Sequence, residues 1–263
     1  AVVMVVGTNS DWETEGNDRS TLQLPGDQDE LIDRVVKANP NTVVVVNTGS
    51  PISMPWIKDT KSILQCWFPG QEFGNALYNI LFGEVNPSGK LPTTFPKSLK
   101  DTPAFNHYPG ENLQMDYLEE IFVGYRWYEK EKIKPLFPFG FGLSYTSFEY
   151  SNLRIIPPKQ EDSAIAFSFK VTNTGGIRGK EATQCYVSVH NSSIERAPKE
   201  LKRFSKVDLE VGETKELTFE LTERDLSYWN ESAESWAVEP AEYRIHVGGS
   251  SEETPLEAST WLG

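Results

Sequence analysis

The chain has 263 residues, 38% of them hydrophobic and 24% charged, which is enough to bury one large core or two smaller ones. Its formal net charge is −13 and no lysine or arginine run stands out, so phosphate backbones and anionic membranes would be repelled. Neither a nucleic acid nor a membrane is therefore an expected partner, and no apolar segment approaches transmembrane length.

The first part of the chain, residues 1–96, alternates short apolar runs with helical patterns. The run AVVMVV has no basic leader, so we do not read it as a secretory signal. It is continuous and β-branched, which is typical of a parallel strand covered on both faces. TVVVVNTGSP and SILQCWFPG repeat the pattern. Strands and helices in this order predict an α/β domain with a mostly parallel sheet.

Two helices are expected in the same part of the chain. The first begins after Pro25 and Gly26, where acidic residues in the first turn favour the helix dipole. It should end near Asn39, because Pro40 cannot continue a helix and restrains the residue before it. The second helix is expected over residues 72–82.

The rest of the chain has a different character. Residues 97–148 are irregular and aromatic, and we expect an ordered connector because a disordered linker would not carry so many aromatic side chains. From residue 149 to 263 the apolar period becomes two. Runs such as AIAFSFKV, ATQCYVSV, TKELTFELT and AEYRIHVG predict an all-β sandwich of immunoglobulin or fibronectin type III-like form.

An acidic loop follows the first expected strand, in the sequence TNSDWETEGNDR. Most acidic clusters are solvated surface, which is the simplest explanation. However, ligands of open α/β sheets gather at the carboxyl ends of the strands, and this loop leaves such an end. A carboxyl group can act as a general acid near neutral pH when an apolar wall or a second carboxylate raises its pKa, and Trp12, Glu13 and Glu15 offer both devices. Asp18 and Arg19 could close the loop as an ion pair.

Other catalytic and binding motifs lack support. The histidines His107, His190 and His246 have no metal-ligand spacing, and HExxH, CxxC and GxSxG are absent, so we expect neither a metal nor a cofactor. GTNSDWE lacks the glycines of a dinucleotide-binding turn. Cys66 and Cys185 are interpreted as two free thiols rather than one disulfide.

Several long stretches resemble the C-terminal portion of family 3 glycoside hydrolases, in particular their β-glucosidases. They are WETEGNDRSTLQLPGDQDELI, CWFPGQEFGNALYNILFGEVNPSGKLPTTFPKSL and PLFPFGFGLSYTSFEY, while the tail resembles the fibronectin type III-like domain of those enzymes. The resemblance spans nearly the whole chain. It implies an α/β sandwich domain without its first strands, and retaining hydrolysis of terminal, non-reducing β-D-glucosyl residues.

The resemblance also implies a catalytic residue. The family pattern EGxDR, here EGNDR, places the acid/base at Glu15. Glu13 is the rival, because ETE allows a shift of two residues, whereas Gly16 directly follows Glu15 and favours it. Asp11 lies closer to the strand and is the weakest candidate. The nucleophile of the family is an aspartate in an N-terminal barrel, and it has no counterpart here.

Aromatic residues could line the substrate pocket. Trp12 is the candidate for substrate binding, and Trp67, Trp127 and Tyr128 are alternatives that could equally pack in a core. The glycines and prolines of GKLPTTFP and FGFGLSY are expected to fix the path of the chain.

The expected partners are a β-glucoside or oligosaccharide substrate and an N-terminal barrel, as a domain or as a second chain; a homo-oligomer is left open. Without the barrel, this chain alone should be inactive. The alternative is a non-catalytic carbohydrate-binding or structural module derived from such an enzyme. Asn191 in NSS and Asn230 in NES are glycosylation sequons, which slightly favour secretion over a cytoplasmic location.

Overall fold

The computed structural model describes residues 1–16 and 18–263. The chain divides into two compact units. Unit 1 comprises Ala1–Phe82, Thr94–Leu118 and Lys134–Phe137, and unit 2 comprises Gly83–Thr93, Glu119–Ile133 and Pro138–Gly263. Both units therefore take segments from the aromatic middle of the chain. The domain boundaries expected at residues 96 and 148 stay a prediction.

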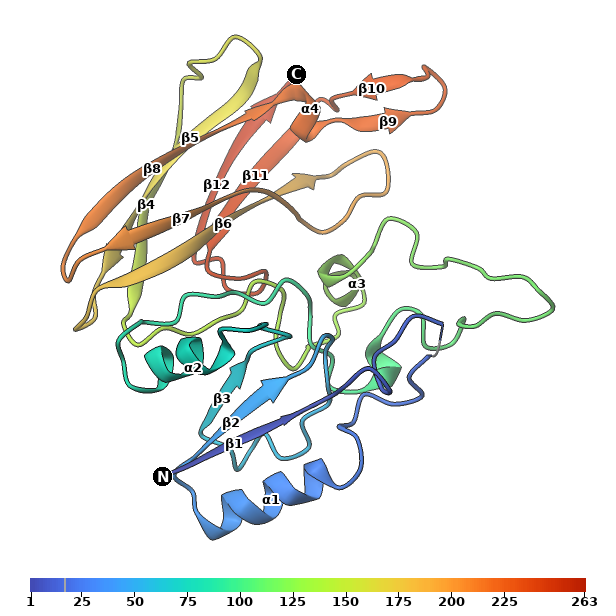
Figure 1. Cartoon of the computed structure of the whole chain (residues 1–263). Helices are drawn as coiled ribbons and strands as arrows, with labels where there is room; N and C mark the ends of the chain where they lie inside the picture. Colours follow the sequence, from blue (N-terminus) through green and yellow to red (C-terminus); the bar gives the residue numbers. More distant parts are fainter. Residues whose placement is uncertain (17) are drawn as a thin grey trace. The chain divides into compact units, whose positions relative to one another are not determined.

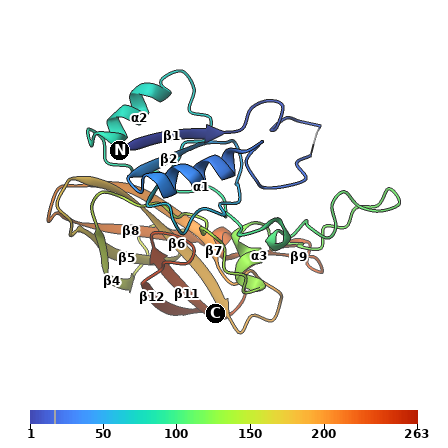
Figure 2. The same cartoon turned by 90° about the horizontal axis from the view of Figure 1, so that it is seen from below.

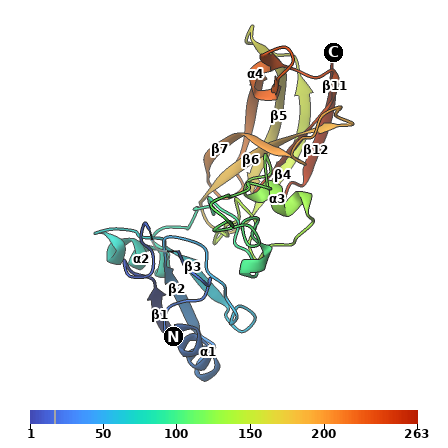
Figure 3. The ribbon, with the colours of Figure 1, turned by 90° about the vertical axis from the view of Figure 1, so that its right-hand side faces the viewer.

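Unit 1 contains a parallel sheet and two helices, as the sequence predicts. Its strands β1 (Val2–Gly7), β2 (Thr42–Asn47) and β3 (Ser62–Gln65) lie in the order β1-β2-β3. The three strands lie between helix α1 (Gln28–Ala38) and helix α2 (Phe73–Leu81) (Figures 1 and 3). Both helices thus fall where the apolar pattern places them. In α1, Ile32 and Val36 form the buried stripe.

One face of β1 is more exposed to solvent than the sequence predicts. In register with β2, Met4 pairs with Val44 and both are buried. Val3 and Val5 point the other way because successive side chains of a strand alternate, and they are 50% and 53% exposed. The expectation that this strand is covered on both faces is therefore wrong for the described chain. The sheet leaves an apolar face of its edge strand open.

Unit 2 is an antiparallel β-sandwich, which confirms the predicted fold class (Figures 1 and 2). One sheet has the order β12-β11-β6-β7 and the other β4-β5-β8. Alternating residues of the two sheets build the core, with Phe167, Phe169 and Ile245 fully buried. The strands are β4 (Phe148–Ile156), β5 (Ser163–Asn173), β6 (Gly179–His190), β7 (Glu200–Leu209), β8 (Thr214–Thr222), β11 (Ala241–Gly248) and β12 (Leu256–Leu262).

Shorter elements complete the two units. In unit 2, α3 (Tyr125–Lys130) and α4 (Glu223–Leu226) accompany a two-stranded hairpin of β9 (Tyr228–Asn230) and β10 (Ser235–Ala237). In unit 1, a 3₁₀ turn spans Leu99–Asp101. Strands β4 and β12 have no counterpart among the runs predicted from the sequence, although β12 carries a period-two pattern. No helix among the described residues is both long and apolar enough to span a membrane.

The two glycine- and proline-rich motifs meet within unit 2. Nζ of Lys90, from GKLP, donates a hydrogen bond to the carbonyl of Gly142, from FGFGLSY, at 3.0 Å. It also lies 3.2 Å from Oε1 of Glu181, a buried carboxylate on β6. A side chain at position 142 would collide with the backbone oxygen of Gly89. The motifs therefore fix the path of the chain, and Lys90 joins them to the buried Glu181 of β6.

Candidate active site

The loops that follow the three parallel strands meet around the carboxylate of Glu13. Its Oε1 accepts a hydrogen bond from the hydroxyl of Thr8 at 2.6 Å, just after β1, and from the backbone N–H of Gly49 at 3.1 Å, after β2. A Cβ placed on Gly49 would lie 2.5 Å from Oε2 of Glu13 and 2.6 Å from the ring of Phe68, after β3. The acidic loop thus lies at the carboxyl end of the sheet, where α/β proteins bind ligands.

Arg19 provides the countercharge for Glu13. Its Nη1 lies 3.8 Å from Oε1 of Glu13 and donates a hydrogen bond to the hydroxyl of Ser50 at 2.6 Å. The Arg19 and Glu13 side chains are only 14% and 13% exposed. Burial lowers the pKa of Arg19, while the neighbouring Glu13 opposes that shift. Glu13 and Arg19 therefore hold the loops after β1 and β2 together.

Glu15 is placed differently from Glu13. It is exposed, and among the described residues it has no hydrogen-bond or ion-pair partner. Gly16 follows with φ +88°, a backbone conformation that glycine adopts readily, and the chain turns there. Asn17, the middle residue of EGNDR, lies outside the described residues. The described part of the chain does not enclose Glu15.

Asp18 and Arg19 do not form the expected ion pair within the described residues. Arg19 turns to Glu13 and Ser50, whereas Oδ2 of Asp18 accepts a hydrogen bond from the hydroxyl of Tyr108 at 2.6 Å. This bond, which involves Asp18 as acceptor, raises the pKa of Tyr108. The expected pairing fails because the half-buried Arg19 pairs with the half-buried Glu13 rather than with the exposed Asp18. Asp18 instead ties the acidic loop to the segment around residue 108.

Asp11, the weakest candidate, is exposed, and its backbone N–H donates to Oδ1 of Asn9 in a local turn. Thr8, Ser50 and Tyr108 contact the site but were not singled out from the sequence. For Thr8 and Ser50 a signal existed, because Thr8 lies directly after one apolar strand and Ser50 lies three residues after the next. For Tyr108 there was none, since it is 90 residues from Asp18.

The aromatic candidates fall into both units. Trp12 is half-buried beside Glu13, and its indole N–H has no acceptor among the described residues. Trp67 packs edge-to-face on Phe95, with 6.0 Å between ring centroids. Trp127 and Tyr128 lie on α3 in unit 2, where Tyr128 is buried. Trp12 is therefore the aromatic residue that shares the loop of the candidate carboxylates.

No group of three or more histidine, cysteine, aspartate or glutamate residues is arranged to hold an ion among residues 1–16 and 18–263. Cys66 and Cys185 are both free thiols, as expected. Burial raises the pKa of each, so both remain protonated near neutral pH.

Family models match most of the chain. The model of the glycosyl hydrolase family 3 C-terminal domain matches residues 1–145, which include the acidic loop and the GKLP motif. The fibronectin type III-like domain model matches residues 181–251, within the sandwich of unit 2.

Known proteins match over nearly the whole chain. The chain is 45% identical over 258 residues to thermostable beta-glucosidase B of Acetivibrio thermocellus, covering 98% of this chain and 34% of that protein. Among solved structures it is similar to the beta-glucosidase of Kluyveromyces marxianus in complex with glucose, with 44% identity and a TM-score of 0.92, covering 99% of this chain and 31% of the other. The Bifidobacterium adolescentis GH3 beta-glucosidase gives 40% identity and a TM-score of 0.93, covering 99% and 39%. The chain thus spans about a third of the length of these relatives.

Proposed function

Because the chain belongs to glycosyl hydrolase family 3, we propose that it is the acid/base-bearing C-terminal part of a retaining β-glucosidase. Glu15 is the acid/base, and the substrate is a β-glucoside or an oligosaccharide with a terminal, non-reducing β-D-glucosyl residue. The Kluyveromyces relative was solved with glucose, which supports this class of sugar. The nucleophile is an aspartate of an N-terminal barrel that joins this chain as a domain or as a separate polypeptide.

The observation that carries the assignment of Glu15 is the contrast between the two glutamates of ETE. The Glu13 side chain is only 13% exposed and is already engaged by Thr8, Gly49 and Arg19. Glu15 is exposed two residues further on, at the carboxyl end of the sheet, and has no partner among the described residues. A general acid has to reach the glycosidic oxygen, and a residue that holds loops together cannot move to do so. Glu13 remains the rival in the role of acid/base.

The chemistry needs a second carboxyl group that this chain does not supply. In a retaining glycosidase the two groups stand roughly 5–5.5 Å apart across the glycosidic bond. The barrel aspartate attacks the anomeric carbon while the carboxylic acid of Glu15 donates its proton to the departing oxygen. The Glu15 carboxylate then takes a proton from water, which cleaves the glycosyl–enzyme bond and restores both groups. Trp12, in the acidic loop, would contact the leaving group.

A chimera tests this proposal. This chain replaces the matching C-terminal third of the Kluyveromyces enzyme, and hydrolysis is measured with aryl β-glucosides of graded leaving-group ability. Glu15→Ala should slow substrates with poor leaving groups by about 10²–10⁴-fold, because these need protonation, and activated substrates far less. Azide should rescue the second step by attacking the glycosyl–enzyme without a base. The chain alone should show no turnover.

Uniform loss across the leaving groups, without azide rescue, would overturn the role of Glu15. A chimera that folds but hydrolyses no glucoside would instead favour the second candidate, a non-catalytic carbohydrate-binding or structural module. This second candidate is supported by the fact that the chain corresponds to only about a third of each related enzyme. Measurable affinity of the chain for an oligosaccharide, with no activity in the chimera, would establish it.

A further inference from the structure

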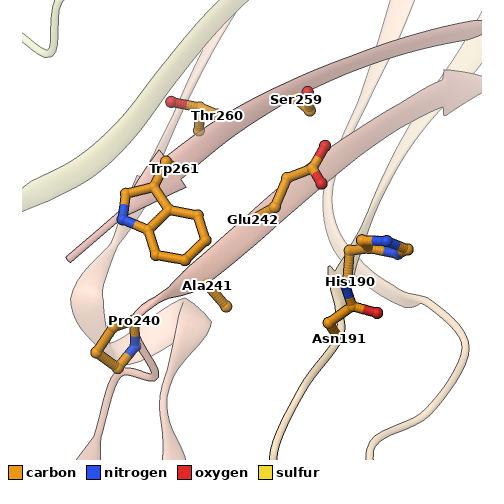
Figure 4. Close-up of a pocket in the computed structure, with 8 residues that line it drawn as sticks. All are labelled: His190, Asn191, Pro240, Ala241, Glu242, Ser259, Thr260 and Trp261. Carbon is orange, nitrogen blue, oxygen red and sulfur yellow. The ribbon is translucent and has the colours of Figure 1, made fainter.

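A pocket of about 510 Å³ opens on the four-stranded sheet of unit 2 (Figure 4). It lies where β6, β11 and β12 run side by side, and its lining includes His190, Asn191, Glu242 and Trp261. Its volume falls within the range of roughly 300–1,000 Å³ that is typical of small-molecule sites. None of these residues belongs to the acidic loop of unit 1, so the pocket is built from residues other than the proposed catalytic ones.

Strand register places three of the lining side chains in one row. Glu242 of β11 pairs directly with Trp261 of β12 on one side and with His190 of β6 on the other. Residues directly opposite on antiparallel strands share a face, with Cβ atoms about 4.5–5.5 Å apart. Ala241 and Tyr243, which flank Glu242 in the chain, are buried in the core. Because side chains alternate along a strand, the row of three lies on the face of the sheet that is turned away from the core.

Trp261 gives the row a large apolar surface. Its side chain is 64% exposed, and Figure 4 shows the ring beside Pro240, Ala241 and Glu242. A single exposed tryptophan is unremarkable on a protein surface. What distinguishes Trp261 is that it lines a pocket that also contains the polar side chains of His190, Asn191 and Glu242, so an aromatic ring lies beside hydrogen-bonding groups.

Glu242 supplies a fixed negative charge next to the ring. A hydrogen bond from the hydroxyl of Ser259, together with the neighbouring Arg244, holds its pKa below the usual range. Nε of Arg244 lies 3.4 Å from Oε1 of Glu242. A carboxylate has about four lone-pair positions, so two partners leave it able to accept further hydrogen bonds from a ligand.

We propose that this pocket binds a neutral saccharide. The apolar C–H face of a pyranose ring stacks on the indole of Trp261, and its hydroxyl groups donate to Glu242. His190 and the side-chain amide of Asn191 can each donate or accept, which suits hydroxyl groups that do both. The row of three side chains spans about 10 Å, enough for two adjoining rings. An anionic saccharide would meet Glu242 and a net charge of −13, so an anionic ligand is disfavoured.

Calorimetric titration of the 263-residue chain with cellobiose and cellotetraose tests the proposal. The chain is produced without glycosylation, because Asn191 lies in a sequon. We expect saturable binding with a Kd on the order of 1 mM. Trp261→Ala should weaken it by at least about tenfold, Trp261→Phe by less because a ring remains, and Glu242→Gln by about threefold because a weaker acceptor replaces a charged one.

Trp229→Ala is the matched control, since Trp229 is 49% exposed but lies in the β9–β10 hairpin against Trp236. It should bind as the unmodified chain does, and thermal unfolding checks that every variant folds. Absence of saturation with both sugars at ten times the expected Kd (about 10 mM) would overturn the proposal. Equal affinity of Trp261→Ala and the unmodified chain would also overturn it. So would binding of p-cresol, an aromatic compound without the hydroxyl groups of a sugar ring, when neither sugar binds.

Discussion

The backbone N–H of Gly49 donates a hydrogen bond to the carboxylate of Glu13, 36 residues earlier in the chain. This contact joins the loop after β1 to the loop after β2, and Arg19 neutralises the carboxylate from the side. Glu15 follows Glu13 by two residues on the same loop, so its position depends on this anchor. Glu13 is therefore expected to act through Glu15, as a positioning residue.

Glu13→Gln in the chimera with the Kluyveromyces enzyme tests that role. The amide keeps the shape of the side chain but loses the charge opposite Arg19, so the loop should shift and turnover should fall by up to about 100-fold. Because the proton donor would be intact, the loss should be the same for good and poor leaving groups, and azide should restore nothing. A loss that grows with the pKa of the leaving group, together with azide rescue, would make Glu13 the acid/base in place of Glu15.

Gly49→Ala tests the packing of the same anchor. The new methyl group would meet Oε2 of Glu13 and the ring of Phe68 within 2.6 Å, so the carboxylate has to move. We expect the chain to lose about 1–3 kcal/mol of unfolding free energy, measured by urea denaturation. Gly74→Ala is the control: it lies in α2, where the added Cβ meets no atom within 4 Å apart from its chain neighbours and the backbone of its own helix, and it should gain about 0.5–1 kcal/mol. Equal effects of the two substitutions would contradict the proposed crowding at Gly49.

Much of the fold follows from local pattern. Helix α1 ends at Ala38 because Pro40 stops it, and the period-two runs of unit 2 form the sandwich. The pattern could not show that Val3 and Val5 would be half exposed, because a continuous apolar run does not say how many faces are covered. β12 was missed although it alternates, since its exposed face carries Trp261.

The position of the candidate site and its acidic character could be predicted from the sequence, but the contacts between its side chains could not. The strand ends and the acidic residues between Asp11 and Asp18 indicated where the loops would meet. Arg19 pairs with Glu13 because both side chains are largely shielded from solvent. Ser50 accepts a hydrogen bond from Arg19 and Gly49 donates one to Glu13, and these contacts between distant residues depend on the tertiary structure. The contact between Tyr108 and Asp18 joins residues 90 positions apart, and no local signal announces it.

Lys90→Met tests the pair beneath the two glycine-rich motifs. The Glu181 side chain is 7% exposed and also accepts a hydrogen bond from the hydroxyl of Tyr150 at 2.7 Å. Removing the lysine leaves a buried, uncompensated carboxylate, so the free energy of unfolding should fall by about 3–5 kcal/mol. The double variant Lys90→Met/Glu181→Gln should recover part of that loss, because no unpaired charge remains.

Lys37→Met is the control for this pair. Lys37 contacts Asp33 on the exposed surface of α1, and its removal should change stability little. A Lys90→Met chain as stable as the unmodified one would mean that the ion pair contributes nothing to unit 2. Urea denaturation at pH 7 measures all of these variants.

Glu129 on α3 should make stability depend on pH. Burial raises the pKa of its carboxyl group to about 7, although Nζ of Lys199 lies 3.2 Å away and opposes the shift. Its ordinary value is 4.5, so between pH 4.5 and 7 the folded chain binds more protons at this site than the unfolded chain. The contribution to stability is therefore full below pH 4.5 and is lost as the pH rises through 7, by about 1–3 kcal/mol in total.

Urea denaturation at pH 5, 6, 7 and 8 measures this loss. Glu129→Gln removes the titrating group, so the unmodified chain should lose stability relative to this variant as the pH rises across the series. Lys199→Met should extend the loss to higher pH, because removing the ammonium group takes away the interaction that favours the charged carboxylate. Parallel pH profiles for the unmodified chain and Glu129→Gln would show that the carboxyl group of Glu129 titrates at its ordinary pKa and that its burial is relieved in solution.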